Sequence, residues 1–180
     1  MMQAMAKYWA APDTLVVEAG DPAAMIAWLE KQDVDTWHRV VQSWNYDSGD
    51  AVLRWILSRP ECDRGTAAQV FLVEGLGHWI NGVAADPRKF DDENHICRVV
   101  LDHWSHYEQG VLKPHEEHLP AALMARITAL YDRPPFEGTA FRAIMEYQGE
   151  RDAVSKYASE DGKIMVDFNY WAKVNGVTVG

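Results

Sequence analysis

The sequence has few cysteines and no long apolar segment. Only Cys62 and Cys97 occur among 180 residues, which is too few for a disulfide framework or a four-thiolate zinc site. No segment approaches the roughly 20 apolar residues that span a bilayer, and the N-terminal segment lacks the apolar core of a signal peptide. We therefore expect a soluble, cytoplasmic protein with two buried, reduced thiols.

Basic residues are also scarce. Seventeen Lys and Arg stand against 27 Asp and Glu, which gives a formal net charge of -10, and no run of Lys or Arg occurs. Nucleic acid and anionic membranes are therefore excluded as expected partners, because neutralising phosphates requires clustered cations. A basic protein partner, in contrast, would be attracted by such a field.

Apolar and aromatic residues are plentiful. Hydrophobic residues make up 48% of the chain, aromatic residues 11%, and eight tryptophans are present. A chain of this length can bury a sizeable core, so we predict one domain over residues 1–180. Trp and Tyr are also favoured in interfaces.

Apolar residues recur with a helical period and are interrupted by Asp, Gly and Pro. The pattern predicts a mainly α fold, a compact array of antiparallel helix pairs, without a Gly-rich nucleotide-binding turn. His38 is expected to face water, and residues 74–92 to be partly irregular. The expected apolar faces are Met25, Ile26 and Leu29; Trp37, Val40, Val41 and Trp44; Val52, Trp55 and Ile56; Ala67, Val70 and Phe71; Ile96, Val99, Val100, His103, Trp104 and Tyr107; Leu119, Leu123, Ile127 and Leu130; and Phe141, Ile144 and Met145.

The C-terminal part is less regular. Residues 111–180 are predicted as a helical extension, with a helix from about Glu116 to Tyr131. Residues 162–180 mix β-branched and aromatic residues with weak helical spacing, so a helix, a short hairpin and a docking arm stay open for them.

Oxygen-bearing residues gather in the segment "WNYDSGDAVLRWILSRPECDRGTAAQVF", Trp44 to Phe71. A calcium loop is excluded, because glycine stands at position 49, before Asp50, and no glutamate follows at the final ligand position. Asp47, Asp50 and Asp63 are instead predicted as helix caps. Pro60 cannot continue a helix, so the preceding one should stop near Ser58.

The same segment resembles a bacterial family catalogued as domain of unknown function 4274. An Asn-x-Asp-x-Gly turn, an apolar helix with Trp-Ile, Pro-x-Cys-Asp and Gly-Thr-Ala follow one another in that family's order. The resemblance extends from about residue 21 to 110, although Ser48 stands where many relatives have an acid. It implies a bacterial source and a fold neighbourhood, but no activity. We interpret its polar residues as fixing inter-helix corners; the structural signature is Asn45, Asp47, Gly49, Trp55, Cys62, Asp63, Gly65 and Thr66, and the match also includes Ile56, Pro60, Ala67 and Phe71.

Histidines are concentrated in "HWSHYEQGVLKPHEEH", which contains His103, His106, His115 and His118. Imidazoles three residues apart on a helix, with carboxylates nearby, suit zinc or iron. The zinc-protease spacing His-Glu-x-x-His is absent, because residues 115–118 are one residue short. The alternative is that His103 is a satisfied core histidine, and that His115 and His118 begin the next helix.

The sequence favours a protein-binding role over catalysis. Cys62 or Ser105 would need a histidine base and an orienting acid, and no nucleophile-elbow signature is present. Our leading hypothesis is a noncatalytic binding module that needs no cofactor. In its most specific form it is an immunity protein that neutralises a cognate toxin, with a basic toxin domain as the candidate partner. The alternatives are a metal-binding protein or metal-dependent hydrolase using His103 to His118, and a structural or regulatory helical module. The oligomeric state stays open.

Overall fold

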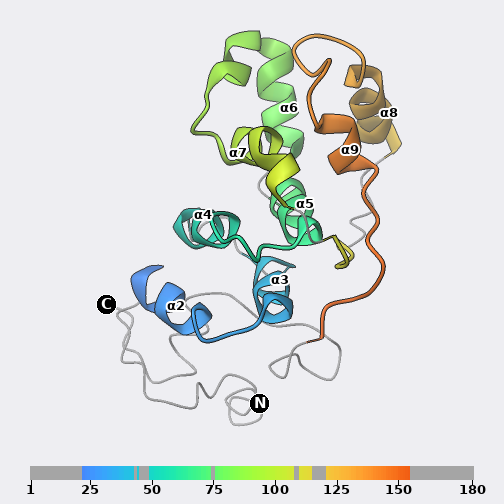
Figure 1. Ribbon diagram of the computed structural model, residues 1–180. Coiled ribbons are helices and arrows are strands. Elements are labelled where there is room, and N and C mark those ends of the chain that lie inside the picture. Colours follow the sequence, from blue (N-terminus) through green and yellow to red (C-terminus); the bar gives the residue numbers. More distant parts are fainter. Residues whose placement is uncertain are drawn as a thin grey trace, which may run out of the picture. The chain divides into compact units, whose positions relative to one another are not determined.

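The computed structural model describes residues 22–42, 44, 49–73, 76–107, 110–114 and 121–154 (Figure 1). The helices are α2 (Pro22–Leu29), α3 (Val34–Gln42), α4 (Ala51–Leu57), α5 (Arg64–Val73), α6 (Leu76–Ala85), η2 (Pro87–Asp91), α7 (Ile96–His103), η3 (Trp104–His106), α8 (Ala121–Leu130) and α9 (Phe141–Met145). The predicted mainly α fold of packed helix pairs is confirmed. In this described part, the one β-type pairing is an isolated parallel bridge between Leu112 and Arg151.

The chain divides into two compact units. The first takes the described residues up to Arg59 and those from Asp152 onward, and the second takes Pro60–Arg151. None of the helices in these described residues is long and apolar enough to cross a membrane. The prediction of a single domain over residues 1–180 stays a prediction.

In the first unit, α2 packs against α4. The apolar face predicted for α3 is buried, with Trp37 7% and Val40 0% exposed. The expectation that His38 faces water was wrong, because His38 is 0% exposed. Its Nε2 lies 3.0 Å from Nε2 of Gln42, so the imidazole is buried with a hydrogen-bond partner from the next turn of the same helix.

In the second unit, α5 packs against α6 and α7, and α6 packs against η2. Aromatic rings fill the space between these helices and the chain around α9. Ring centroids lie 5.9 Å apart for Phe71 and Trp79, and 4.5 Å apart for Phe136 and Phe141. Such tilted and edge-to-face pairs add stability beyond the burial of their surface.

The ends of α4 agree in part with those predicted from Asp50 and Pro60. α4 ends at Leu57 with Ser58 as its C-cap, as Pro60 predicts. Asp50 occupies the N-cap position of α4 but makes no side-chain capping bond there. Its carboxylate lies 2.7 Å from the Arg54 guanidinium instead, so the predicted capping role of Asp50 was wrong.

Residues 74–92 are more regular than their glycines suggested. From Leu76 they form α6 and then η2, while Glu74 and Gly75 lie outside the described residues. A Cβ on Gly82 would lie 3.2 Å from Cδ of Lys89. Gly82 thus lies within α6, close to the stem of Lys89 in η2, and does not break the helix.

The predicted helix over residues 96–107 changes character near its end. α7 stops at His103, and a 3-10 turn continues to His106. His103 is exposed, so its predicted core position was wrong. Several predictions fall outside the described residues: the Asn45 and Asp47 turn, Glu116 to Pro120 with Leu119, and the tail at 162–180.

Candidate functional site

The carboxylate of Asp63 is a buried acceptor that links two distant segments of the second unit. Asp63 is 2% exposed and precedes α5. Its Oδ1 accepts the backbone N–H of Gly65 at 2.7 Å and that of Leu112 at 3.2 Å, and its Oδ2 accepts the backbone N–H of Val111 at 3.0 Å. The predicted cap is confirmed, and the same carboxylate also holds a segment almost fifty residues further along the chain.

Gly65 is required by this junction. A Cβ at position 65 would lie 1.9 Å from the carbonyl oxygen of Leu112, a distance that no side chain tolerates. The backbone amide of Thr66 donates to the carbonyl of Asp63 at 2.9 Å, and Thr66 is 1% exposed. Asp63, Gly65 and Thr66 therefore form one tight corner between the start of α5 and residues 110–113.

Cys62 lies beside this corner as a buried thiol. It is 1% exposed, and burial, with a smaller contribution from the Asp63 carboxylate, raises the pKa of Cys62 to about 12. A nucleophilic cysteine needs a lowered pKa, because the thiolate is the reactive form. Cys62 is thus held protonated near neutral pH, and Cys97 is likewise a buried thiol.

Two tyrosines flank the same region. Burial raises the pKa of both Tyr107 and Tyr147, the latter to about 12. Arg64 lies over the ring of Trp104, which in turn meets Tyr147 edge-on at 5.8 Å. These groups are arranged as packing around the Asp63 corner, with their phenols kept neutral.

In the first unit, two signature residues have structural roles. Gly49 has φ of +73°, a left-handed conformation that suits glycine, and its carbonyl accepts the indole N–H of Trp44 at 3.0 Å. Trp55 meets Trp37 edge-on at 5.3 Å, and the Arg59 guanidinium lies 4.7 Å from the Trp55 ring centroid. Both residues thus shape α4 and the turn that leads into it.

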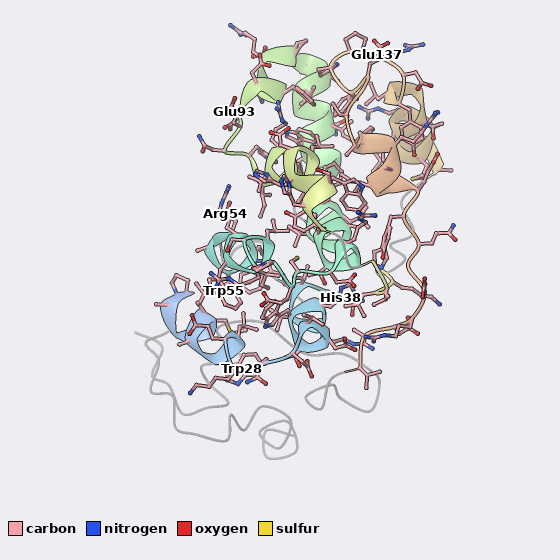
Figure 2. The ribbon with its side chains drawn as sticks, in the orientation of Figure 1. Trp28, His38, Arg54, Trp55, Glu93 and Glu137 are labelled. Atoms are coloured by element: carbon pink, nitrogen blue, oxygen red, sulfur yellow. The ribbon has the colours of Figure 1, made fainter. Side chains whose placement is uncertain are left out.

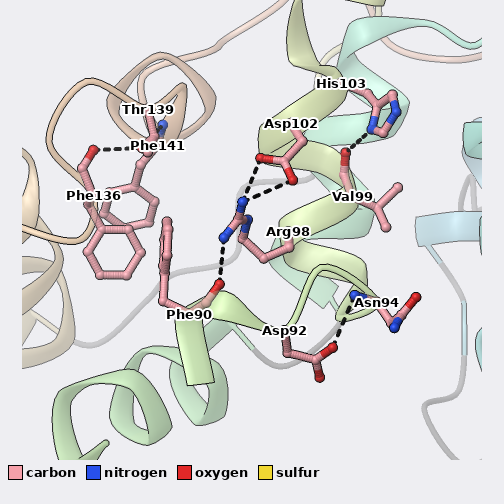
Figure 3. A network of polar contacts seen from close by, with 10 residues as sticks. All are labelled: Phe90, Asp92, Asn94, Arg98, Val99, Asp102, His103, Phe136, Thr139 and Phe141. Carbon is pink, nitrogen blue, oxygen red and sulfur yellow. Dashed lines mark hydrogen bonds and ion pairs between the residues drawn. The ribbon is translucent and has the colours of Figure 1, made fainter. Parts of the chain in front are cut away.

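The structure brings two of the four candidate metal-binding histidines together. The ring centroids of His103 and His106 lie 5.6 Å apart, and both residues are exposed. Nδ1 of His103 lies 2.9 Å from the carbonyl oxygen of Val99, which orients the ring (Figure 3). His115 and His118 lie outside the described residues. Among the residues that are described, no group of three or more His, Cys, Asp or Glu side chains is placed to hold a metal ion.

An acidic turn, Asp91 to Glu93, was not singled out from the sequence. It joins η2 to α7, and all three side chains are exposed, with Glu93 projecting from the turn (Figure 2). The carboxylate of Asp92 accepts the N–H of Asn94 at 3.0 Å. The neighbouring Arg98 is turned toward Asp102 at 3.1 Å and the Phe90 carbonyl at 2.6 Å (Figure 3). Three consecutive acidic residues are the sequence signal that indicates this exposed acidic turn.

A second polar arrangement, on α3, was also missed. Asp35 and Arg39 both reach the backbone at Ala153 and Val154. In the sequence, an acid and a base four residues apart indicate only a solvated helix face. The spacing therefore does not predict their contacts with the backbone of residues 153–154.

Residues 32–82 match the family described as "Domain of unknown function (DUF4274)". The resemblance seen in the sequence is thereby confirmed, over a shorter range than residues 21 to 110. Gly49 and the three residues of the Asp63 corner lie within the matched residues, whereas the acidic turn lies beyond them. No curated protein and no solved structure matches the chain.

Proposed function

We propose that the protein is a noncatalytic protein-binding module, and most specifically a bacterial, cytoplasmic immunity protein that neutralises a basic toxin domain. The observation that carries the proposal is the acidic turn Asp91 to Glu93. Three successive exposed carboxylates on a protein of net charge -10 form a local negative field that attracts a basic surface.

The two arginines nearest to the acidic turn in sequence pair with Asp86 and Asp102, and Lys89 makes no ion pair with the turn. Arg88 pairs with Asp86 at 2.9 Å, and the stem of Lys89 lies against Gly82 of α6. The Arg98 guanidinium lies over the Phe90 ring, 4.5 Å from its centroid. Within the described residues, no cation lies within ion-pair distance of Asp91, Asp92 or Glu93, so their charge is available to a partner.

The backbone of the turn is fixed before a partner arrives. The amide of His95 donates to the carbonyl of Asp92 at 3.0 Å, and Nδ1 of His95 accepts the amide of Cys97 at 3.2 Å to cap α7. A preordered loop loses less conformational entropy on binding. The geometry therefore favours a permanent contact surface over a segment that folds on binding.

Co-expression tests the proposal. The protein is co-expressed with the polypeptide that is encoded directly beside its gene. The host cells are ones that die when this neighbouring polypeptide is expressed alone. We expect survival, and purification of a complex of the two. Cell death with both proteins present at comparable levels would contradict the immunity function.

A charge-matched pair of variants tests the surface. Neutralising the turn with Asp91→Asn, Asp92→Asn and Glu93→Gln should slow association with the neighbouring polypeptide on the order of tenfold at low salt, and by less at high salt. The control carries Asp132→Asn, Glu137→Gln and Glu150→Gln, which remove the same charge from other exposed positions. Equal slowing by both triple variants would mean that net charge, and not the acidic turn, attracts the partner.

The orientation of His103 favours a second candidate, a metal-binding protein. A histidine whose Nδ1 is held by a carbonyl presents Nε2 to a metal in a fixed direction, and His106 is its neighbour. Zinc or iron would then be held with His115 and His118. Metal analysis of protein purified without a histidine tag tests this, and a stoichiometry near zero would exclude it.

A further inference from the structure

In the first unit, two charged side chains of α3 form hydrogen bonds with a single peptide group. Arg39 donates from Nε and Nη2 to the carbonyl oxygen of Ala153, at 3.0 and 2.6 Å. The carboxylate of Asp35 accepts the backbone N–H of Val154 at 2.7 Å. That carbonyl and that N–H belong to the same peptide bond, so both of its polar groups are satisfied by residues one helical turn apart.

These contacts recognise main chain rather than side chains. All three hydrogen bonds involve a charged partner, and such bonds are stronger than neutral ones. The only side-chain requirement is size: Ala153 is 2% exposed, whereas Val154 is 75% exposed. A segment that fits needs a small residue followed by any residue.

The clamp, defined as Asp35 and Arg39, is held in position by its neighbours. Nη1 of Arg39 donates to Oε1 of Gln42 at 3.1 Å. Because arginine only donates, the amide group of Gln42 must face Nε2 of His38, which then accepts its hydrogen bond. The buried imidazole, through Gln42, thus orients the guanidinium toward Ala153.

We propose that the clamp is a binding site for an extended polypeptide segment with a small residue at the position of Ala153, and that residues 152–154 occupy it as an internal competitor. Because the internal segment is tethered, its effective concentration is roughly millimolar. A free segment binds when the internal one is displaced. This inference does not depend on the acidic turn or on the immunity function.

A peptide with the sequence of residues 151–155, acetylated and amidated, is the probe. The full chain with Ala153→Arg should leave the clamp vacant, because an arginine does not fit the space that Ala153 fills. We expect this variant to bind the peptide at least tenfold more tightly than the wild-type chain, as followed by chemical shifts in NMR titration. Adding Arg39→Ala to the variant should abolish binding, and a peptide with arginine in place of alanine should not bind. Equal binding by all three proteins would overturn the proposal.

A second measurement uses the wild-type chain alone. The Val154 amide should be protected from hydrogen exchange by Asp35, and excess peptide should lower that protection by displacing residues 152–154. The amide of Arg54, within α4, is the control and should not change. Unaltered protection of Val154 at saturating peptide would overturn the proposal even if the Ala153→Arg chain failed to fold.

Discussion

Replacing Asp63 by alanine should destabilise the second unit more than any other loss of a single carboxylate there. The substitution leaves the amides of Gly65, Val111 and Leu112 without their acceptor. A hydrogen bond to a charged group contributes about 1.5–3 kcal/mol. Because the three share one carboxylate and Val111 is partly accessible to water, we expect a loss of about 4 kcal/mol rather than the full sum.

The asparagine variant gives a graded comparison. Asp63→Asn keeps one oxygen, which can still accept from Gly65 and Leu112, but turns an NH₂ group toward the Val111 amide. We expect a loss of about 2 kcal/mol. Asp132→Ala is the control, because that carboxylate is exposed and pairs with Arg142 at 3.3 Å on the surface, where ion pairs contribute little.

Thermal unfolding followed by circular dichroism and hydrogen exchange are the assays. For a chain of this size, 1 kcal/mol corresponds to about 2–4 °C, so Asp63→Ala should lower Tm by roughly 8–16 °C. The Val111 and Leu112 amides should lose protection in the same variant. If Asp63→Ala matched Asp132→Ala in Tm and kept both amides protected, the corner would not stabilise the fold as argued.

Three further predictions concern the same region. Gly65→Ala should lower the free energy of unfolding by roughly 3 kcal/mol, because its Cβ would meet the Leu112 carbonyl at 1.9 Å. Gly138→Ala, with φ of +75° and open space around it, should lower it by about 1 kcal/mol. Similar Tm values for the two variants would refute the close approach at Gly65. Stability should fall as pH rises above 9, because Cys62 and Tyr147 ionise in the unfolded chain while the native state keeps them neutral, with pKa values of about 12. A Tm that does not change with pH above 9 would argue against this, and so would a Cys62→Ala variant whose Tm declines as much as that of the wild type. Neither Cys62 nor Cys97 should react with a thiol reagent near neutral pH until denaturant is added; rapid labelling of the native protein would show that a thiol is accessible.

Much of the helical framework could be predicted from the sequence because its signals are local. The period of Trp37, Val40 and Val41 predicts the buried face of α3, and Pro60 predicts the end of α4 near Ser58. Asp63 was recognised as a cap for the same reason, since its bond to Gly65 spans two residues.

Other features depend on contacts between distant parts of the chain. No sequence pattern indicates the hydrogen bonds from the Val111 and Leu112 amides to Asp63. The same is true of the hydrogen bonds that Asp35 and Arg39 make with the backbone of residues 153–154. The helical spacing alone predicts an exposed His38, but Gln42, one turn further along α3, provides the hydrogen-bond partner that allows the imidazole to be buried. The burial of a polar residue is decided by such partners more than by its own hydropathy.

The most direct test of the proposed function is survival of cells that express the neighbouring polypeptide. We predict that the wild-type protein and the Asp132, Glu137 and Glu150 triple variant protect these cells, while the Asp91, Asp92 and Glu93 triple variant protects less, in proportion to its slower association. Death of cells that contain the wild-type protein would contradict immunity, and full protection by both variants would contradict the acidic turn as its contact surface.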